Sequence, residues 1–241
     1  MTTDQFVQEG DPTWEPIQKP AEIAETRLIR AILEGAFPIN SHLPGERELA
    51  EILGVTRSTL REVLQRLARD GWLDIQHGKP TRVCDYWKEG RLGVLNTLSE
   101  QPDQLPNNFI PDLLTARLAM APMYTSMAVA NAPEKVTELL AGRKNLEPSP
   151  EDFSNFDWLV QHELTIFGQN AIFVLIVNGF KDLYLNLAPI YFSIPAARQH
   201  SMDYYEALSK AAVQNDIEQS RKLTEDVMRE SLIFWYKTNI L

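Results

Sequence analysis

Two short helices separated by a tight turn, between residues 46 and 70, constrain the fold of this chain most. Glu46–Leu53 has the pattern of a helix, and Gly54 ends it because glycine takes the left-handed conformation easily. The next helix, Arg57–Asp70, follows Thr56 as its N-cap and carries an apolar stripe at positions i, i+3, i+4 and i+7. The stripe consists of Leu60, Val63, Leu64 and Leu67. That face is expected to pack against a core, which leaves the opposite face to solvent or a partner.

The neighbouring segments add a further helix and a hairpin. A helix is expected to begin at Pro20, where the missing proline N–H does no harm, and to end at Gly35. Two short alternating runs, at 72–76 and 81–84, flank residues 77–80 and predict a β-hairpin. Helix, helix, tight turn, helix and hairpin is the order of a winged helix-turn-helix, which we expect over residues 20–85.

The charge of the chain is distributed unevenly. The formal net charge of −10 argues against a general nucleic-acid binder. Between residues 56 and 82, however, six lysines and arginines stand against three acidic residues. Phosphate contacts are local, and remote charges are screened within about 8–10 Å, so this basic island suits DNA. The same charges also occur on solvated helices, and charge alone leaves both interpretations open.

The start of the helix at Arg57–Asp70 is the candidate DNA reader. An α-helix fits the major groove, and side chains near its N-terminus reach base edges. We expect Arg57 to bind a guanine through two hydrogen bonds, and Arg61, one turn later, to meet the next base or a phosphate. Gly78 allows a tight turn at the hairpin tip, so that His77 and Lys79 can approach the backbone or the minor groove.

The rest of the chain has the pattern of an all-α domain. Polar residues 1–19 are expected to form a flexible arm, and residues 86–98 a linker. Residues 99–241 are expected to form a helical bundle, with helices at 110–130, 134–145, 151–168, 172–187, 201–214 and 217–237. The fold class is therefore mainly α, with one small β-hairpin. The first twenty residues lack an apolar core and the longest apolar stretch, 171–179, is too short for a span, so a cytoplasmic protein without a membrane partner is expected.

A few polar side chains of the helical domain can face its interior. Arg117 lies among leucines and a methionine, so it either faces a pocket or extends from the helix edge to solvent. Ser231 and Trp235 are one turn apart on the last helix and share a face. For these two residues core packing is the simpler explanation, and the same holds for Tyr184, Tyr191 and Tyr205.

The sequence LPGERELAEILGVTRSTLREVLQRLARDGWLDIQHGKPTRV, residues 43–83, resembles the DNA-binding domain of the GntR family of bacterial transcription regulators. Residues 54–81 resemble more narrowly the fatty-acid-metabolism regulators of that family, and a weaker resemblance continues through residues 178–184 and 191–192. It implies DNA contacts from the two helices at Arg47, Thr56, Arg57, Ser58, Thr59 and Arg61. It also implies wing contacts at His77, Gly78 and Lys79. Ser58 stands where the similar regulators carry threonine, which keeps the hydroxyl.

The resemblance also implies a ligand. Regulators of this kind bind long-chain acyl-CoA in the helical domain and then lose affinity for operator DNA. The positions that match their pocket are Arg117, Tyr191, Ser231 and Trp235. Met228 stands where a glycine is expected, and its bulk would alter the path of the acyl chain or the entry of CoA.

No metal or other cofactor is expected. Many relatives with this kind of domain hold a metal through an aspartate and three histidines. His162 falls where one such histidine would lie, but Tyr205 stands at the next position and the last helix has no histidine. The single cysteine, Cys84, lies in the wing and fits a reducing compartment.

Several functions remain open. A regulator with the same DNA chemistry could respond to a small organic acid, since tyrosines and an arginine also suit a carboxylate. An enzyme acting on acyl-CoA is disfavoured, because neither a nucleophile elbow nor a pair of catalytic carboxylates is visible. An architectural DNA protein would not need the second domain. One recognition helix reads too few base pairs to find a site in a genome, so a homodimer on an inverted-repeat operator is expected.

Overall fold

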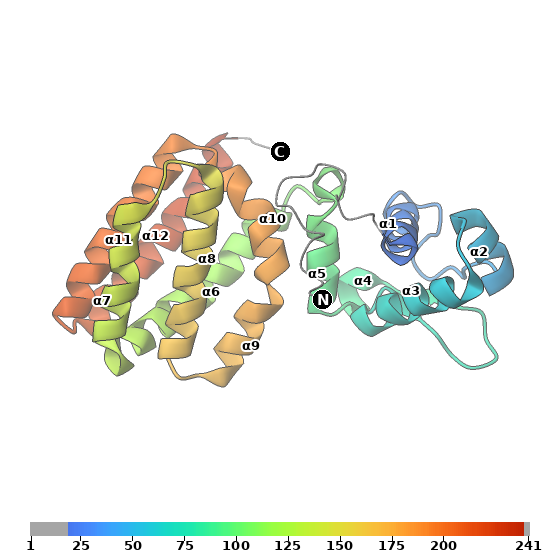
Figure 1. Ribbon diagram of the computed structural model, residues 1–241, viewed down its shortest axis with the longest axis horizontal. Coiled ribbons are helices and arrows are strands. Elements are labelled where there is room, and N and C mark those ends of the chain that lie inside the picture. The colour runs from blue at the N-terminus through green and yellow to red at the C-terminus, as the bar shows by residue number, and fades with distance from the viewer. Residues whose placement is uncertain (1–18, 239–241) are drawn as a thin grey trace, which may run out of the picture. The chain divides into compact units, whose positions relative to one another are not determined.

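The computed structural model describes residues 19–238, which divide into a first unit ending at Arg91 and a second beginning at Leu92. Figure 1 shows the helices of both units. Of the expected N-terminal arm, residues 1–18 lie outside the described residues.

The first unit contains the predicted helices α1 (Pro20–Leu33), α2 (Glu46–Leu53) and α3 (Arg57–Asp70). The bounds predicted for α2 and α3 are confirmed, and both helices end at a glycine with positive φ, Gly54 at 71° and Gly71 at 89°. The apolar stripe of α3 is buried against α1 and α2. Local capping signals therefore determine where these helices begin and end.

The hairpin is confirmed, but its strands are shorter than predicted. β1 (Leu73–Asp74) pairs antiparallel with β2 (Arg82–Val83), with Leu73 opposite Val83. Trp72, Leu73 and Val83 lie in the core of the unit. Residues 75–81 form the loop between the strands, because only the hairpin base has a core to pack against.

The segment expected as a linker, residues 86–98, is largely helical. α4 (Tyr86–Glu89) lies in the first unit, where the Tyr86 ring centroid is 4.6 Å from that of Trp72. α5 (Leu92–Ser99) lies in the second unit and packs against α10 (Lys181–Phe192). Only Gly90 and Arg91 separate the two helices.

The second unit is helical, as predicted. After α5 and a 3₁₀ turn at Pro102–Gln104, it contains α6 (Phe109–Asn131), α7 (Pro133–Ala141) with a 3₁₀ extension at Gly142–Asn145, α8 (Pro150–Phe167), α9 (Ala171–Gly179), α10, α11 (Pro195–Val213) and α12 (Ile217–Thr238). Figure 1 shows α6, α7, α8, α11 and α12 as a bundle, with α9 and α10 along α8. The core lies between these helices and includes Val160, Leu164, Tyr205 and Leu208.

Two helix predictions are wrong in detail. The single helix expected at 172–187 is two helices, because the chain turns at Gly179 and Phe180. A Cβ on Gly179 would lie 2.9 Å from the Leu92 side chain, and Asn96 Oδ1 accepts a 3.3 Å hydrogen bond from the Leu183 backbone N–H. Both contacts come from α5, so the break is a tertiary effect. The helix expected at 201–214 begins earlier, at Pro195, which occupies its first turn.

Among the described residues, no one helix has the length and apolar character to cross a membrane. Only α9 and α10 taken together have that length and apolar character, and the two helices are bent by 64° relative to each other.

Candidate functional site

The hydroxyl groups of Thr56, Ser58 and Thr59 gather at the N-terminus of α3. Thr56 Oγ1 accepts a 3.2 Å hydrogen bond from the Thr59 backbone N–H, which confirms Thr56 as the N-cap. It also lies 2.9 Å from both Ser58 Oγ and Thr59 Oγ1. The first turn of α3 is thereby fixed, and Thr56 and Ser58 remain exposed.

The three arginines near this helix start differ in their partners. The Arg57 side chain is exposed and has no hydrogen bond or ion pair within residues 19–238. Arg61 Nε lies 2.8 Å from Glu46 Oε2, and Arg47 Nε lies 3.2 Å from Glu51 Oε1. Both pairs are largely exposed, so they contribute little to stability and break at little cost.

The wing tip is a tight turn centred on Gly78, whose φ is 73°. The Lys79 backbone N–H donates to Gln76 O at 3.1 Å, and Lys79 Nζ donates to Gln76 Oε1 at 2.8 Å. His77, Gly78 and Lys79 are all exposed. A groove of about 490 Å³ lies between the tip and the start of α2, and its lining includes Glu46 and the wing residues.

The base of the wing is held by α4. Arg82 donates to both carboxylate oxygens of Glu89, at 3.0 and 2.8 Å, and lies 3.6 Å from Asp74. The hydrogen bonds from Arg82 and from the Asp85 backbone lower the pKa of Glu89 to about 2. Arg91 donates to the carbonyl of Arg69, and its backbone N–H to that of Asp70. The last turn of α3 and the wing are therefore both attached to the segment that leads into the second unit.

The second unit contains two small adjoining cavities, of about 40 and 50 Å³. We call the one between α6, α8, α9 and α10 cavity 1, and the one beside Tyr191 and Trp235 cavity 2. Both walls include Leu113, Arg117 and Tyr184, so the cavities meet at these residues. The sequence left open whether Arg117 faces a pocket, and the structure places it at this junction.

Arg117 belongs to a buried polar cluster. Its Nη2 lies 3.3 Å from Asp157 Oδ2, and its guanidinium carbon lies 5.1 Å from the centre of the Tyr184 ring. Tyr205 donates to Asp157 Oδ1 at 2.6 Å, and Tyr184 donates to Asp157 Oδ2. Burial raises the pKa values of Tyr184 and Tyr205 well above the ordinary value, so both phenols keep their protons and act as donors. Asp157 is therefore compensated by one cation and two neutral donors.

The remaining expected pocket residues lie beside cavity 2. Tyr191 Oη and Ser231 Oγ are 3.2 Å apart, and Tyr191 and Trp235 line the cavity. Ser231 and Trp235 are both buried, on the same face of α12 as expected. Met228, one turn earlier, is buried in the bundle core.

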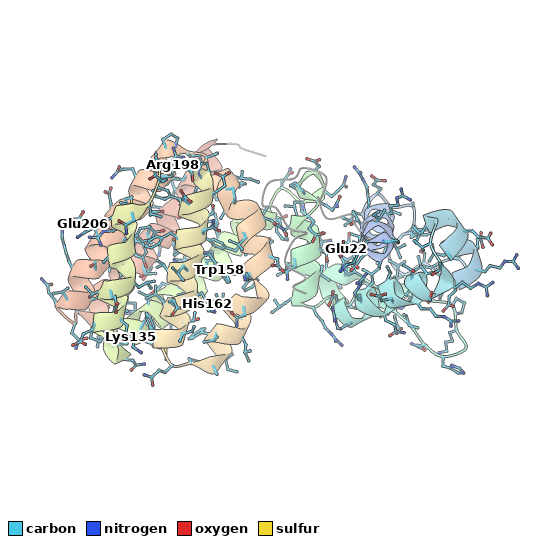
Figure 2. All side chains as sticks on the ribbon, in the orientation of Figure 1. Glu22, Lys135, Trp158, His162, Arg198 and Glu206 are labelled. Carbon is cyan, nitrogen blue, oxygen red and sulfur yellow. The ribbon has the colours of Figure 1, made fainter. Side chains whose placement is uncertain are left out.

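His162 and Tyr205 do not come together as metal ligands. Trp158 and His162 both lie on α8 (Figure 2), and their rings stack with centroids 5.8 Å apart. The His162 Nδ1 lies 3.5 Å from Glu163. Tyr205 is engaged by Asp157. Within residues 19–238 no group of three or more His, Cys, Asp or Glu side chains is placed to hold a metal ion.

Comparison with known proteins decides the family. The family model of the gntR family of bacterial regulatory proteins matches residues 20–83, and the FadR C-terminal domain matches residues 84–240. The chain belongs to the GntR family. It is accordingly a DNA-binding transcription regulator rather than an enzyme, which confirms the family resemblance seen in the sequence.

Curated relatives and one solved structure agree with this assignment. The "fatty acid metabolism regulator protein" of Shewanella halifaxensis is 46% identical over 195 residues, which cover 80% of this chain and 81% of the relative. The protein of the same name from Shewanella pealeana is 47% identical over 195 residues, which cover 80% of this chain and 81% of the relative. The structure of Lar, which controls expression of the Listeria monocytogenes agr system, is 18% identical and has a TM-score of 0.60 over 93% of this chain and 100% of that one. The last likeness supports the fold of this GntR-family regulator.

Sequence reasoning missed two residues that line cavity 1 of this GntR-family regulator and one that pairs with Arg117 beside it. Asp157, Tyr124 and Gln161 were not singled out, although Asp157 is a charge among the aromatic residues of α8. That signal could have found Asp157. Tyr124 and Gln161 carry no such signal, because their pairing joins α6 to α8 across the bundle.

Proposed function

We propose that this GntR-family regulator controls genes of fatty-acid metabolism and that long-chain acyl-CoA, bound in the second unit, lowers its affinity for operator DNA. The relatives at 46–47% identity are named as fatty acid metabolism regulators. The observation that supports this effector is the pair of adjoining cavities along α6, whose walls are mostly apolar. DNA as the target places the regulator in the bacterial cytoplasm.

The DNA part of the proposal assigns separate roles to the exposed residues of the first unit. Arg57, which has no partner within residues 19–238, reads a guanine in the major groove. Arg47 and Arg61 exchange their exposed carboxylate partners for phosphates, and the hydroxyls of Ser58 and Thr59 contact the backbone or a thymine methyl group. His77, Gly78 and Lys79 meet the adjacent minor groove from the wing.

Two copies of the chain bind an inverted repeat. A two-fold dimer doubles the number of base pairs that are read and matches the symmetry of such an operator. The first unit exposes apolar side chains that suit contact with a second copy, among them Ile52 and Trp87, which are 59% and 49% exposed. Sedimentation of the operator complex would overturn this assignment if it showed one chain bound to a single half-site.

The ligand part assigns the acyl chain to the apolar walls of both cavities. Each buried methylene contributes about 0.8 kcal/mol, so affinity increases with chain length until the space is full. Tyr191, Ser231 and Trp235 receive the part of the ligand that enters beside α12. A small organic acid is the second candidate, but Arg117 is already matched by Asp157, which makes a carboxylate partner for it less favourable.

The two sites are coupled through the segment between α4 and α5. A ligand weakens DNA binding only if it prefers a conformation in which the recognition helices no longer fit the half-sites. A shift of α5 would act on Arg91, which is hydrogen-bonded to carbonyls at the end of α3. Coupling of this kind is typically about 1–3 kcal/mol, or roughly 5–150-fold in operator affinity.

Titration of the operator-bound protein tests the proposal. Saturated acyl-CoAs of increasing chain length and a panel of small organic acids are added, and operator binding is followed by fluorescence anisotropy. Release that strengthens with chain length supports the proposal. If saturating long-chain acyl-CoA leaves operator affinity unchanged and an organic acid releases the DNA, the second candidate is the effector.

A further inference from the structure

Cavity 1 contains one polar pair in an otherwise mostly apolar wall. Tyr124 on α6 donates a 2.6 Å hydrogen bond from its phenol to Gln161 Oε1 on α8. Both side chains line the cavity and both are buried, with exposed fractions of 3%. Gln161 lies one helical turn after Asp157 on α8.

The Gln161 amide nitrogen has no hydrogen-bond partner among the residues that the structure describes. Burial raises the pKa of Tyr124 above its ordinary value, so the phenol is protonated and donates. In the structure Gln161 presents its oxygen to the Tyr124 phenol, which leaves the NH₂ group as the unpaired end. A buried donor without an acceptor costs free energy, so a ligand that supplies the acceptor binds more tightly.

The wall contains three other polar side chains, Arg117, Tyr184 and the partly exposed Trp158. Arg117 and Tyr184 both face Asp157. Around the pair, the wall is formed by apolar side chains that accept no hydrogen bond, such as Met120 and Val177. Among the described residues, the Gln161 NH₂ group is therefore a fully buried donor without a partner on the wall of this cavity.

The position of the pair indicates which part of a ligand it would meet. Cavity 2 follows α6 from Ile110 to Arg117, and cavity 1 continues from Leu113 to Tyr124. At about 1.5 Å per residue, Tyr124 lies roughly 10 Å along α6 beyond Arg117. An acyl chain that enters through cavity 2 therefore reaches the pair with its distal half.

We infer that the effector of this regulator is an acyl-CoA whose chain carries a hydroxyl group in its distal half. This inference rests on the proposed function and defines the chemical class of the effector more narrowly. The hydroxyl oxygen accepts a hydrogen bond from the Gln161 NH₂ group, and the hydroxyl proton is donated to Tyr124 Oη, which keeps a free acceptor site. A site built to bind a hydroxyl discriminates strongly against an analogue that lacks it, because its own polar groups are then left unpaired.

The test compares two acyl-CoAs of equal chain length, one saturated and one with a single hydroxyl in its distal half. Their affinities for the full-length protein are measured by calorimetry, and operator release is measured in parallel. The hydroxylated ligand is expected to bind about tenfold more tightly than the saturated one. A third ligand with its hydroxyl next to the thioester is expected to show no such gain.

Two variants assign the effect to the pair. Gln161→Met keeps a similar volume but removes the donor, and it is expected to abolish the preference while still binding the saturated ligand. Tyr124→Phe is expected to reduce the preference, because Gln161 loses the group that orients it. Gln199→Met, at an exposed glutamine of α11, is the matched control and leaves the preference unchanged.

The outcomes separate this inference from the proposed function. If saturated and hydroxylated ligands bind equally well, or if Gln161→Met keeps the preference, the hydroxyl assignment is wrong while the acyl-CoA proposal stands. If Gln161→Met only shifts the preferred length of saturated chains, the pair sets chain length and the inference is overturned. If neither ligand binds, both proposals are wrong.

Discussion

Replacement of Arg117 by methionine should destabilise the second unit strongly. Asp157 is 5% exposed, and Arg117 is the cation that compensates it, at 3.3 Å. Removing one partner of a buried ion pair leaves an uncompensated buried charge, which costs about 3–5 kcal/mol. The two phenol donors, Tyr184 and Tyr205, remain in Arg117→Met, so we expect the loss to fall at the lower end of that range.

The double variant Arg117→Met, Asp157→Asn should recover part of this loss. The asparagine oxygen still accepts a phenol hydrogen bond, and the buried negative charge is gone. The remaining cost is that of one imperfectly paired amide, about 1–3 kcal/mol. The double variant is therefore expected to be more stable than Arg117→Met alone, although it carries one more substitution.

Thermal unfolding measures both variants. A change of 1 kcal/mol shifts Tm by roughly 2–4 °C for a domain of 150–250 residues, so Arg117→Met should lower the Tm of the second unit by about 6–12 °C. Arg229→Met is the matched control, since Arg229 forms an exposed ion pair with Glu225 at 2.7 Å and should leave Tm nearly unchanged. The reasoning is refuted if Arg117→Met behaves like this control, or if the double variant is less stable than the single one.

Three further predictions concern the wing, the base reader and the pocket. Arg57→Ala should abolish the preference for operator over random DNA. Lys79→Ala should weaken binding to operator and random DNA alike and flatten the salt dependence of binding. If anisotropy titrations show that Arg57→Ala weakens binding to operator and random DNA equally, a base contact by Arg57 is excluded. Trp235→Ala should blunt release by acyl-CoA without changing ligand-free operator affinity, and a change in the latter would contradict a pocket role. Because the folded-state pKa of Glu89 is about 2 against an ordinary 4.5, the stability it contributes is present above about pH 4.5 and is lost as pH falls through 2. The Tm gap between the wild type and Glu89→Gln should therefore close over that interval, and a gap that persists below it would show that the carboxylate charge is not the cause.

The helices of the first unit were predictable because their signals are local. Thr56 caps α3 through a hydrogen bond three residues along the chain, and Gly54 and Gly71 end α2 and α3 with positive φ. The apolar stripe of α3 has the spacing of one helical face. Each of these features can be read within a few residues, so distant contacts did not alter the bounds.

The break between α9 and α10 was not predictable in the same way. Residues 172–187 read as one apolar helix, and glycine within such a stretch is tolerated. What separates the helices is α5, since Leu92 packs against Gly179 and Asn96 accepts the Leu183 N–H. α5 is more than eighty residues earlier in the chain, which places this information outside any local window.

The polar pairs of the candidate pocket were likewise not predictable from the sequence. Arg117 could be suspected of facing inward because its helix is apolar around it, but its partner could not be named. Asp157 lies forty residues away, and the Tyr124–Gln161 pair is separated by thirty-seven. Pairing across a bundle depends on how helices cross, which the spacing along one helix does not determine.

The two units hold their charges in different ways, and this difference fits their different ligands. In the first unit, Arg47 and Arg61 are 78% and 68% exposed, and their carboxylate partners are solvated, so a phosphate can replace either partner at little cost. In the second unit, Asp157 is buried and Arg117, 22% exposed, packs against it, so separating the two leaves a carboxylate unpaired in the bundle. A polyanion such as DNA requires cations that are free to exchange. A chain that passes Arg117 must instead be neutral there, because that arginine is not available to it, and this favours an acyl chain over an organic acid at the junction of the cavities.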